Sequence, residues 1–150
     1  ELYKKWSAQE FGRICQALLG LTFKELGYVT RMRWTERPDI EVTKNDKSYA
    51  VEVKATAEKS IQIEQRSLDG VLQQKNSIPI FAILSMELNP KWIIVDAYKL
   101  KPIKYTSKIG LEAYENKNLS TEINNKFAKV LEKYYSLAYE YGTEKLVEYL

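Results

Sequence analysis

The sequence contains no histidine. This absence excludes Ser-His-Asp and Cys-His nucleophilic mechanisms, histidine-ligated metal nucleases and ribonucleases that use histidine for acid–base catalysis. A hydrolase without histidine can still use a hard divalent metal, because Mg²⁺ prefers oxygen ligands such as carboxylates and backbone carbonyls. Among hydrolytic chemistries, the composition therefore favours a carboxylate-bound metal assisted by lysine.

Cysteine is almost absent as well, and Cys15 is the only one in the chain. One cysteine can form neither an internal disulfide nor a four-cysteine zinc or iron–sulfur site. This is consistent with an intracellular protein, located in the cytoplasm or in the host cytoplasm if it is virus-encoded. Cys15 falls in the apolar stripe of an expected helix, so we expect it to fill the core rather than act as a nucleophile.

Long hydrophobic runs are also missing. The chain has no stretch of about 18 apolar residues and no basic segment followed by an apolar leader, so we expect no membrane span and no secretory signal. The hydrophobic content of 45% over 150 residues is enough for one domain with a single core.

The net charge of +3 is unevenly distributed. Residues 1–54 hold ten basic against eight acidic residues, residues 55–110 hold eight against five, and residues 111–150 hold five against seven. The basic excess therefore belongs to the first 110 residues, and the C-terminal 40 are acidic.

The most informative segment is a predicted β-hairpin around Asn45–Asp46, two residues that tolerate the positive φ of a tight turn. If Lys44 pairs with Lys47 across this turn, Asp39 lies opposite Glu52. Directly opposed residues have Cβ atoms roughly 4.5–5.5 Å apart. Two carboxylates at that distance repel each other unless one is protonated or a cation lies between them.

Strand alternation places Lys54 on the same face as Glu52, while Val51, Val53 and Ala55 point into the core. The acid-x-Lys tripeptide also occurs at 115–117, but that copy lies in a polar stretch without strand alternation. The alternative interpretation is an ordinary surface hairpin whose charges are solvated.

Pro38–Asp39 followed by Glu52-Val53-Lys54 resembles the signature of the PD-(D/E)XK nuclease superfamily. Within that superfamily the spacing is most similar to archaeal Holliday-junction resolvases, over residues 6–98. The resemblance implies an α/β fold, a restriction-endonuclease-like sandwich with a central mixed β-sheet flanked by helices. It also implies a further acid from the preceding helix, where Glu10 stands; the alternative for Glu10 is a solvated residue at the helix margin.

The resemblance and the residues together imply metal-dependent hydrolysis of a DNA phosphodiester. Asp39 and Glu52 would bind one or two Mg²⁺ ions, which Mn²⁺ could replace. The Val53 carbonyl would be a further ligand, and Glu10 would complete the site. Lys54 would orient or deprotonate the attacking water, or neutralise the charge that develops on the phosphate.

Basic residues near this site are candidates for phosphate contacts, which would make DNA binding weaken with salt. They are concentrated in residues 31–37 and 99–108, and a glutamine opens the second expected helix. The predicted DNA-binding residues are Arg13, Arg31, Arg33, Arg37, Gln65, Lys99, Lys101 and Lys104. The alternative is that these side chains are ordinary solvated surface.

Periodicity predicts a helix over 5–26 ended by Gly27, a strand over 28–34, the hairpin, and a helix over 64–75 weakened by Gly70. Two further strands, 78–86 and 92–98, are expected to pair through an Asn89–Pro90 turn. A long helix from Ser120 to the glycine at 142 and a short final helix follow. We expect residues 1–110 to form the nuclease core and residues 111–150 to form a helical extension, packed on the core or at an oligomer interface within one domain.

Three functions remain open. The first is a structure-specific, junction-resolving endonuclease acting on branched DNA as a homodimer or higher homo-oligomer. The second is another nuclease of the same superfamily, of the restriction, repair, mobile-element or viral type, acting on duplex DNA. The third is a DNA-binding module that keeps the fold without turnover.

Overall fold

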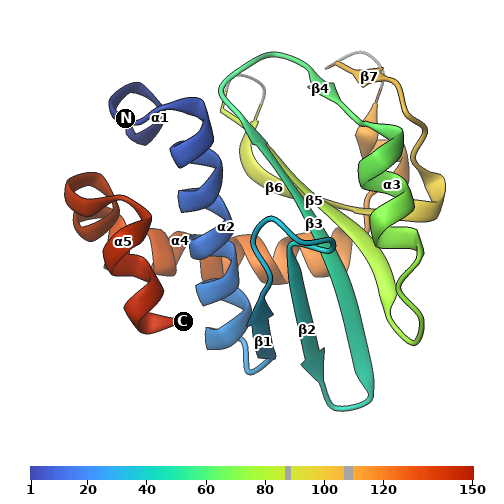
Figure 1. The fold of residues 1–150 in the computed structure, drawn as a ribbon, viewed down its shortest axis with the longest axis horizontal. Helices are drawn as coiled ribbons and strands as arrows, with labels where there is room; N and C mark the ends of the chain where they lie inside the picture. Colours follow the sequence, from blue (N-terminus) through green and yellow to red (C-terminus); the bar gives the residue numbers. More distant parts are fainter. Residues whose placement is uncertain (87–88, 107–109) are drawn as a thin grey trace.

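The computed structural model describes residues 1–86, 89–106 and 110–150. Its centre is a five-stranded sheet in the order β1-β2-β3-β5-β6, built from β1 (Val29–Met32), β2 (Ile40–Lys44), β3 (Lys47–Thr56), β5 (Ile78–Ser85) and β6 (Asn89–Asp96). Only β3 and β5 run parallel, and the other neighbours are antiparallel, so the sheet is mixed. Helices cover both faces (Figure 1), and the predicted α/β sandwich with a C-terminal helix is confirmed.

The first expected helix is two helices, α1 (Leu2–Lys5) and α2 (Ala8–Glu25). The break comes at Ser7, whose side chain accepts a hydrogen bond from the backbone N–H of Glu10 at 3.1 Å. An N-cap serine satisfies a donor that the first helical turn leaves without a partner, so a new helix begins there. As expected, α2 ends before Gly27, which has a φ of +95°.

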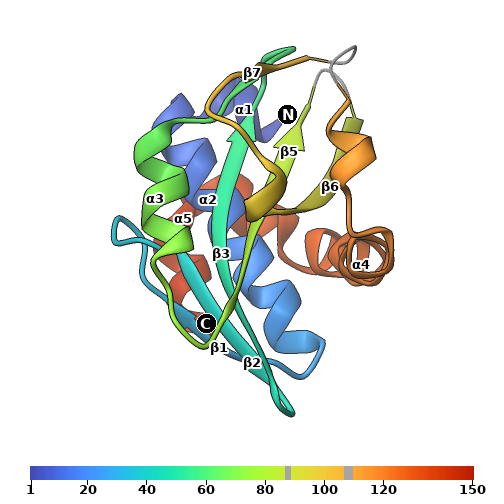
Figure 2. The same ribbon diagram turned by 90° about the vertical axis from the view of Figure 1, so that its right-hand side faces the viewer.

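The two faces of the sheet belong to two hydrophobic clusters. Val51 of β3 and Ile80 of β5 point toward α2 and toward α4 (Lys117–Tyr141), whereas Ala50 and Phe81 point toward α3 (Gln65–Leu72). This alternation follows from the two-residue period of a strand. Figure 2 shows α3 and α4 on opposite sides of the strands.

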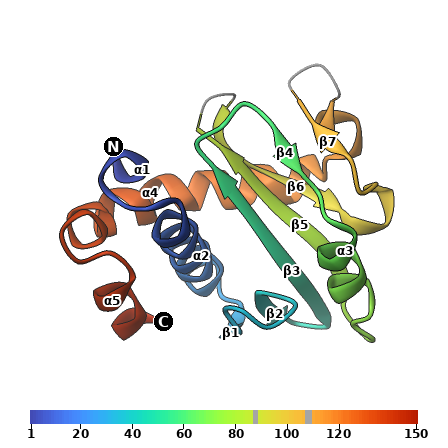
Figure 3. The ribbon, with the colours of Figure 1, turned by 45° about the horizontal axis from the view of Figure 1, so that its top comes forward.

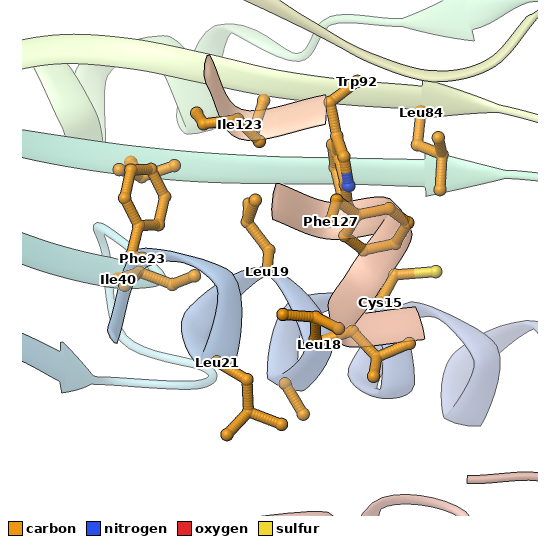
Figure 4. Close-up of a cluster of buried hydrophobic side chains, with 14 of the residues drawn as sticks. Cys15, Leu18, Leu19, Leu21, Phe23, Ile40, Leu84, Trp92, Ile123 and Phe127 are labelled. Atoms are coloured by element: carbon orange, nitrogen blue, oxygen red, sulfur yellow. The ribbon is translucent and has the colours of Figure 1, made fainter. Parts of the chain in front are cut away.

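The larger cluster joins α2, α4 and the sheet (Figure 4). Trp92 of β6 meets Phe127 of α4 edge-to-face, with ring centroids 5.7 Å apart. Cys15 lies in the same cluster, and burial raises the pKa of its thiol far above its ordinary value. Cys15 is therefore core filler, as predicted.

Several strand ends differ from the prediction. β1 ends at Met32 because the chain turns at Trp34, which has a positive φ of 57°. β6 begins at Asn89, so Asn89–Pro90 belongs to the strand and does not form the expected turn. The segment around 60–63 contributes β4 (Ile61–Gln62), which pairs with β7 (Lys104–Tyr105) in a separate two-stranded sheet.

α4 begins earlier than expected, because Asn116 caps it through a hydrogen bond from the Leu119 N–H at 3.1 Å. Polar side chains of α4 also form hydrogen bonds with the backbone of the edge strand β6. Ser120 accepts a hydrogen bond from the Ile94 N–H at 2.9 Å, and Asn124 exchanges two hydrogen bonds of 2.8 Å with the Trp92 backbone. An edge strand presents unpaired backbone groups, and α4 covers those of β6.

The chain ends in α5 (Thr143–Leu146) and a short 3₁₀ turn, which lie beside α2 (Figure 3). Within the described ranges, no helix is both long enough and apolar enough to cross a lipid bilayer.

Candidate functional site

The hairpin register agrees with the sequence prediction. Lys44 pairs with Lys47, and the ladder continues to the pair Ile40 and Val51. Asp39 stands one residue before β2, and its Oδ2 accepts a hydrogen bond from the Val53 N–H at 2.9 Å. The Asp39 side chain thus extends the ladder by one step and places its carboxylate beside β3.

Glu52 of β3 is the neighbour of this carboxylate. Only 2% of the residue is exposed to solvent, although glutamate is rarely buried without a partner. One carboxylate oxygen, Oε2, contacts the Arg37 guanidinium, and the other, Oε1, has no hydrogen-bond partner among the residues that the structure describes. A buried acceptor without a partner carries a desolvation penalty of roughly 1–3 kcal/mol or more.

Arg37 connects this carboxylate to α3. Its Nη1 donates a second hydrogen bond to the buried Ser67 hydroxyl at 2.9 Å. The aliphatic part of Arg37 lies against Gly70, where an added Cβ would be 2.5 Å from the arginine Cδ. The glycine that weakens α3 in the sequence therefore makes room for Arg37.

Burial and mutual repulsion change the protonation of both acids. Burial, followed by the charge of Asp39, raises the pKa of Glu52 to about 8, although Arg37 and Lys54 act in the opposite direction. Burial also raises the pKa of Asp39, against the hydrogen bond from Val53. The pair therefore holds at least part of a proton near neutral pH, or it needs a positive charge nearby.

A pocket of about 370 Å³ lies against this cluster. Asp39, Glu52, Val53 and Lys54 all line it, so the structure brings together four of the predicted site residues. Half-buried Lys54 lies close enough to lower the pKa of both carboxyl groups. The complete lining is Gln9, Gly12, Arg13, Gln16, Trp34, Thr35, Arg37, Asp39, Glu52, Val53, Lys54 and Ala55.

Glu10 is not part of this cluster, contrary to the prediction. Its Oε2 accepts a hydrogen bond from the Thr143 N–H at 2.8 Å, so the side chain caps the start of α5. The described residues contain no group of three or more acidic, histidine or cysteine side chains arranged to hold a metal. Glu10 points away from the acid pocket because successive residues of a helix are rotated by about 100° around its axis. The α2 residue that lines the pocket is therefore the preceding one, Gln9.

Sequence reasoning missed the two glutamines of α2 that line the pocket, Gln9 and Gln16. Gln16 is only 9% exposed and donates a hydrogen bond to the Trp34 carbonyl at 3.4 Å. The signal was present, because residues seven apart recur on one side of a helix. Two glutamines at this spacing mark the polar margin of α2 that faces the hairpin.

Of the predicted DNA contacts, Arg13 and Arg37 line the pocket. Arg33 is engaged instead with Glu36 and Glu41, at 2.8 and 3.1 Å. Arg31 lies 3.6 Å from Glu41 and is largely exposed. The remaining candidates lie outside the pocket: Gln65, which donates to Asp69 at 2.8 Å, and Lys99, Lys101 and Lys104, which are exposed on the segment before and within β7.

No protein-family model matches the chain, and no curated protein matches it. Among solved structures, its fold is similar to that of Hjc, a Holliday junction resolvase from the archaeal hyperthermophile Archaeoglobus fulgidus. The superposition has a TM-score of 0.53 and 13% sequence identity, and it covers 69% of this chain and 89% of the resolvase chain. The shared feature is the α/β fold.

Proposed function

We propose that the protein is a metal-dependent DNA endonuclease of the PD-(D/E)XK type, and that it acts on branched DNA as a junction-resolving enzyme does. The observation that carries the proposal is the pair formed by half-buried Asp39 and buried Glu52, which line a pocket together with Lys54. The resemblance in fold to an archaeal Holliday junction resolvase supports the choice of DNA as substrate.

The acid pair suits a divalent cation. Glu52 Oε1 is buried without a hydrogen-bond partner in the described part of the chain, and both carboxyl pKa values are raised, so a cation between the two acids would relieve two costs at once. Oxygen ligands and an open, wet site are what Mg²⁺ prefers, and Mn²⁺ accepts the same ligands. Asp39, Glu52 and the Val53 carbonyl are the ligands that we propose, and bound metal would polarise the scissile phosphate and lower the pKa of a bound water.

Lys54 is the proposed partner of the attacking water. It stands on the same face of β3 as Glu52 and lines the same pocket. An ammonium group there can orient the water and neutralise negative charge as it develops on the phosphate, which is electrostatic stabilisation in a partly desolvated site.

Arg37 has a second role in this proposal. Without a metal, its guanidinium neutralises one oxygen of Glu52, so a cation entering the site competes with it. We propose that the arginine then binds a phosphate oxygen of the DNA, a role that suits its planar, forked donors. Gly70 lies against the aliphatic part of the side chain, which can stay in place, whereas the guanidinium would have to leave both Glu52 and Ser67.

The Arg37–Glu52 contact also favours a second candidate function. If the guanidinium alone compensates the carboxylate, the protein is a DNA-binding module that keeps the fold without turnover. Six of the predicted DNA contacts do not line the pocket, and they remain predictions under either function: Arg31, Arg33, Gln65, Lys99, Lys101 and Lys104.

Cleavage assays separate these candidates. A labelled four-way junction, a linear duplex and single-stranded DNA are incubated with the protein in Mg²⁺ or Mn²⁺. The variants are Asp39→Asn, Glu52→Gln and Lys54→Ala. The matched control is Glu58→Gln, an exposed acid in the loop after β3 whose carboxylate makes no described contact.

Symmetric cutting of the junction, lost in the three site variants and kept in the control, supports the resolvase proposal. Such an enzyme works as a two-fold dimer, so its oligomeric state in solution is measured on the same samples. Cutting of the linear duplex instead indicates another nuclease of the superfamily. Binding without any cutting in either metal leaves the non-catalytic module.

A further inference from the structure

A second hollow adjoins the acid pocket. It has a volume of about 460 Å³, within the range of roughly 300–1,000 Å³ that is usual for small-molecule sites. It lies between α2, the turn after β1 and the start of α5. Its lining consists of Glu10, Arg13, Trp34, Thr35, Thr143, Glu144 and Val147, and three of these, Arg13, Trp34 and Thr35, line the acid pocket too.

Trp34 stands on the border between the two spaces. Its φ of 57° lies in the left-handed region, which a bulky side chain rarely adopts, and the Gln16 side chain holds its carbonyl at 3.4 Å. The residue is only half-buried, whereas Trp92 is enclosed in the core. Trp34 packs against the edge of the larger hydrophobic cluster and also lines both hollows, so part of this large aromatic residue is available to a ligand.

The lining of the second hollow carries charges of both signs. Arg13, at the border, is exposed and has no ion pair or hydrogen bond to any residue that the structure describes. Glu10, one helical turn before Arg13 on α2, and Glu144 of α5 also line the hollow, and Glu10 accepts a hydrogen bond from the Thr143 N–H. Arg13 is therefore the group in this lining that can bind a phosphate, whereas the Glu144 carboxylate can accept hydrogen bonds from amino groups.

We propose that the second hollow binds one unpaired nucleobase of the DNA substrate, stacked on Trp34, while Arg13 holds a neighbouring phosphate. The inference rests on the proposed nuclease function and specifies its substrate class, which is DNA with an unpaired or splayed base next to the cleaved phosphate. Aromatic stacking is available to every base. A carboxylate beside it, Glu144, favours bases that carry an exocyclic amino group, such as cytosine, over thymine.

Binding is tested without cleavage, in Ca²⁺ or in EDTA, by fluorescence anisotropy. The probes are a blunt duplex and the same duplex with a short gap of unpaired dC or of unpaired dT. The variants are Trp34→Ala, Trp34→Phe and Glu144→Gln, and the matched control is Trp6→Phe, a half-buried tryptophan that lines neither space. Circular dichroism and the Tm of each variant establish that it is folded.

We expect Trp34→Ala to reduce the preference for the dC gap over the duplex by about 5- to 100-fold, because base–aromatic stacking is lost. Trp34→Phe should keep most of the preference, and Trp6→Phe all of it. Glu144→Gln should bring the affinities for dC and dT gaps closer together. An equal loss for the gapped and blunt probes in Trp34→Ala would overturn the inference, as would no loss at all.

Cleavage in Mg²⁺ is measured separately, so that the two proposals can fail separately. If the unaltered protein cleaves DNA but Trp34→Ala leaves the gap preference unchanged, the nuclease proposal stands and the base site is refuted. If the unaltered protein cuts nothing but Trp34→Ala abolishes the gap preference, the base site stands and the nuclease proposal is refuted.

Discussion

Replacing Glu52 by glutamine tests the electrostatic account of the site without changing its shape. The pKa of this buried carboxyl is raised from its ordinary value of 4.5 to about 8, chiefly by burial and then by Asp39. Between these two pH values the folded protein holds a proton that the unfolded chain has released. The free energy of unfolding therefore falls as pH rises through this window.

The size of this effect follows from linkage. One proton difference corresponds to a slope of at most about 1.36 kcal/mol per pH unit. From pH 5.5 to 7.5 the loss of stability should thus be about 2–3 kcal/mol, or roughly 5–10 °C in Tm for a chain of this length. Glu52→Gln should remove most of the slope and leave only the part that comes from Asp39, whose pKa is also raised. At pH 7.5 the variant should then be the more stable protein.

Mg²⁺ should distinguish the unaltered protein from Glu52→Gln. Its binding to the acid pair would stabilise the unaltered protein at pH 7.5, by about 3 kcal/mol at a hundredfold excess over Kd, and would do little for Glu52→Gln. The measurement is a set of thermal or urea unfolding curves across this pH range, with and without Mg²⁺.

A flat or rising stability curve for the unaltered protein would refute the reasoning. It would mean that the Arg37 contact dominates over burial and keeps Glu52 ionised at every pH. The site would then need no further cation, and the non-catalytic function would gain support.

Three further predictions concern neighbouring residues. Lys54→Ala should lower the rate of Mg²⁺-dependent cleavage by about 100-fold or more without changing DNA affinity in Ca²⁺, since residues in acid–base roles contribute at least that much; equal rates would refute its role. Gly70→Ala should destabilise the fold by about 1–3 kcal/mol in urea unfolding, because its Cβ would lie 2.5 Å from the Arg37 Cδ. Gly12→Ala, with no atom within 4 Å of the added Cβ, should stabilise the helix by about 0.5–1 kcal/mol as the matched control. Glu10→Ala should cost about 1 kcal/mol of stability as the loss of a helix cap, yet keep the full Mg²⁺-induced rise in Tm, which a metal ligand would not.

The hairpin shows how far local pattern reaches. The turn residues Asn45–Asp46 and the alternation of β3 fix which residues are paired and which face each side chain shares. The register of the ladder and the position of Asp39 next to Glu52 could therefore be predicted, because both depend on contacts only a few residues away from the turn.

The first helix shows where local pattern fails. Its apolar stripe predicts which side is buried, and the buried residues of α2 agree with it. The apolar stripe does not predict which parts of the chain contact the polar residues on either side of it. The pattern predicts Glu10 at the metal site, but Thr143 at the start of α5, 133 residues farther along the chain, packs beside α2 and donates its N–H to that carboxylate.

The sequence by itself determined the chemistry available to this protein: no histidine, one inert thiol, and an acid pair with a lysine on a short hairpin. Tertiary structure alone decided what surrounds that pair, including the Arg37 link to α3, the glutamines of α2 and the hollow behind Trp34. The physical reason is range. Turn geometry and strand alternation act over a few residues, whereas burial and charge compensation depend on elements that meet only when the whole chain is packed.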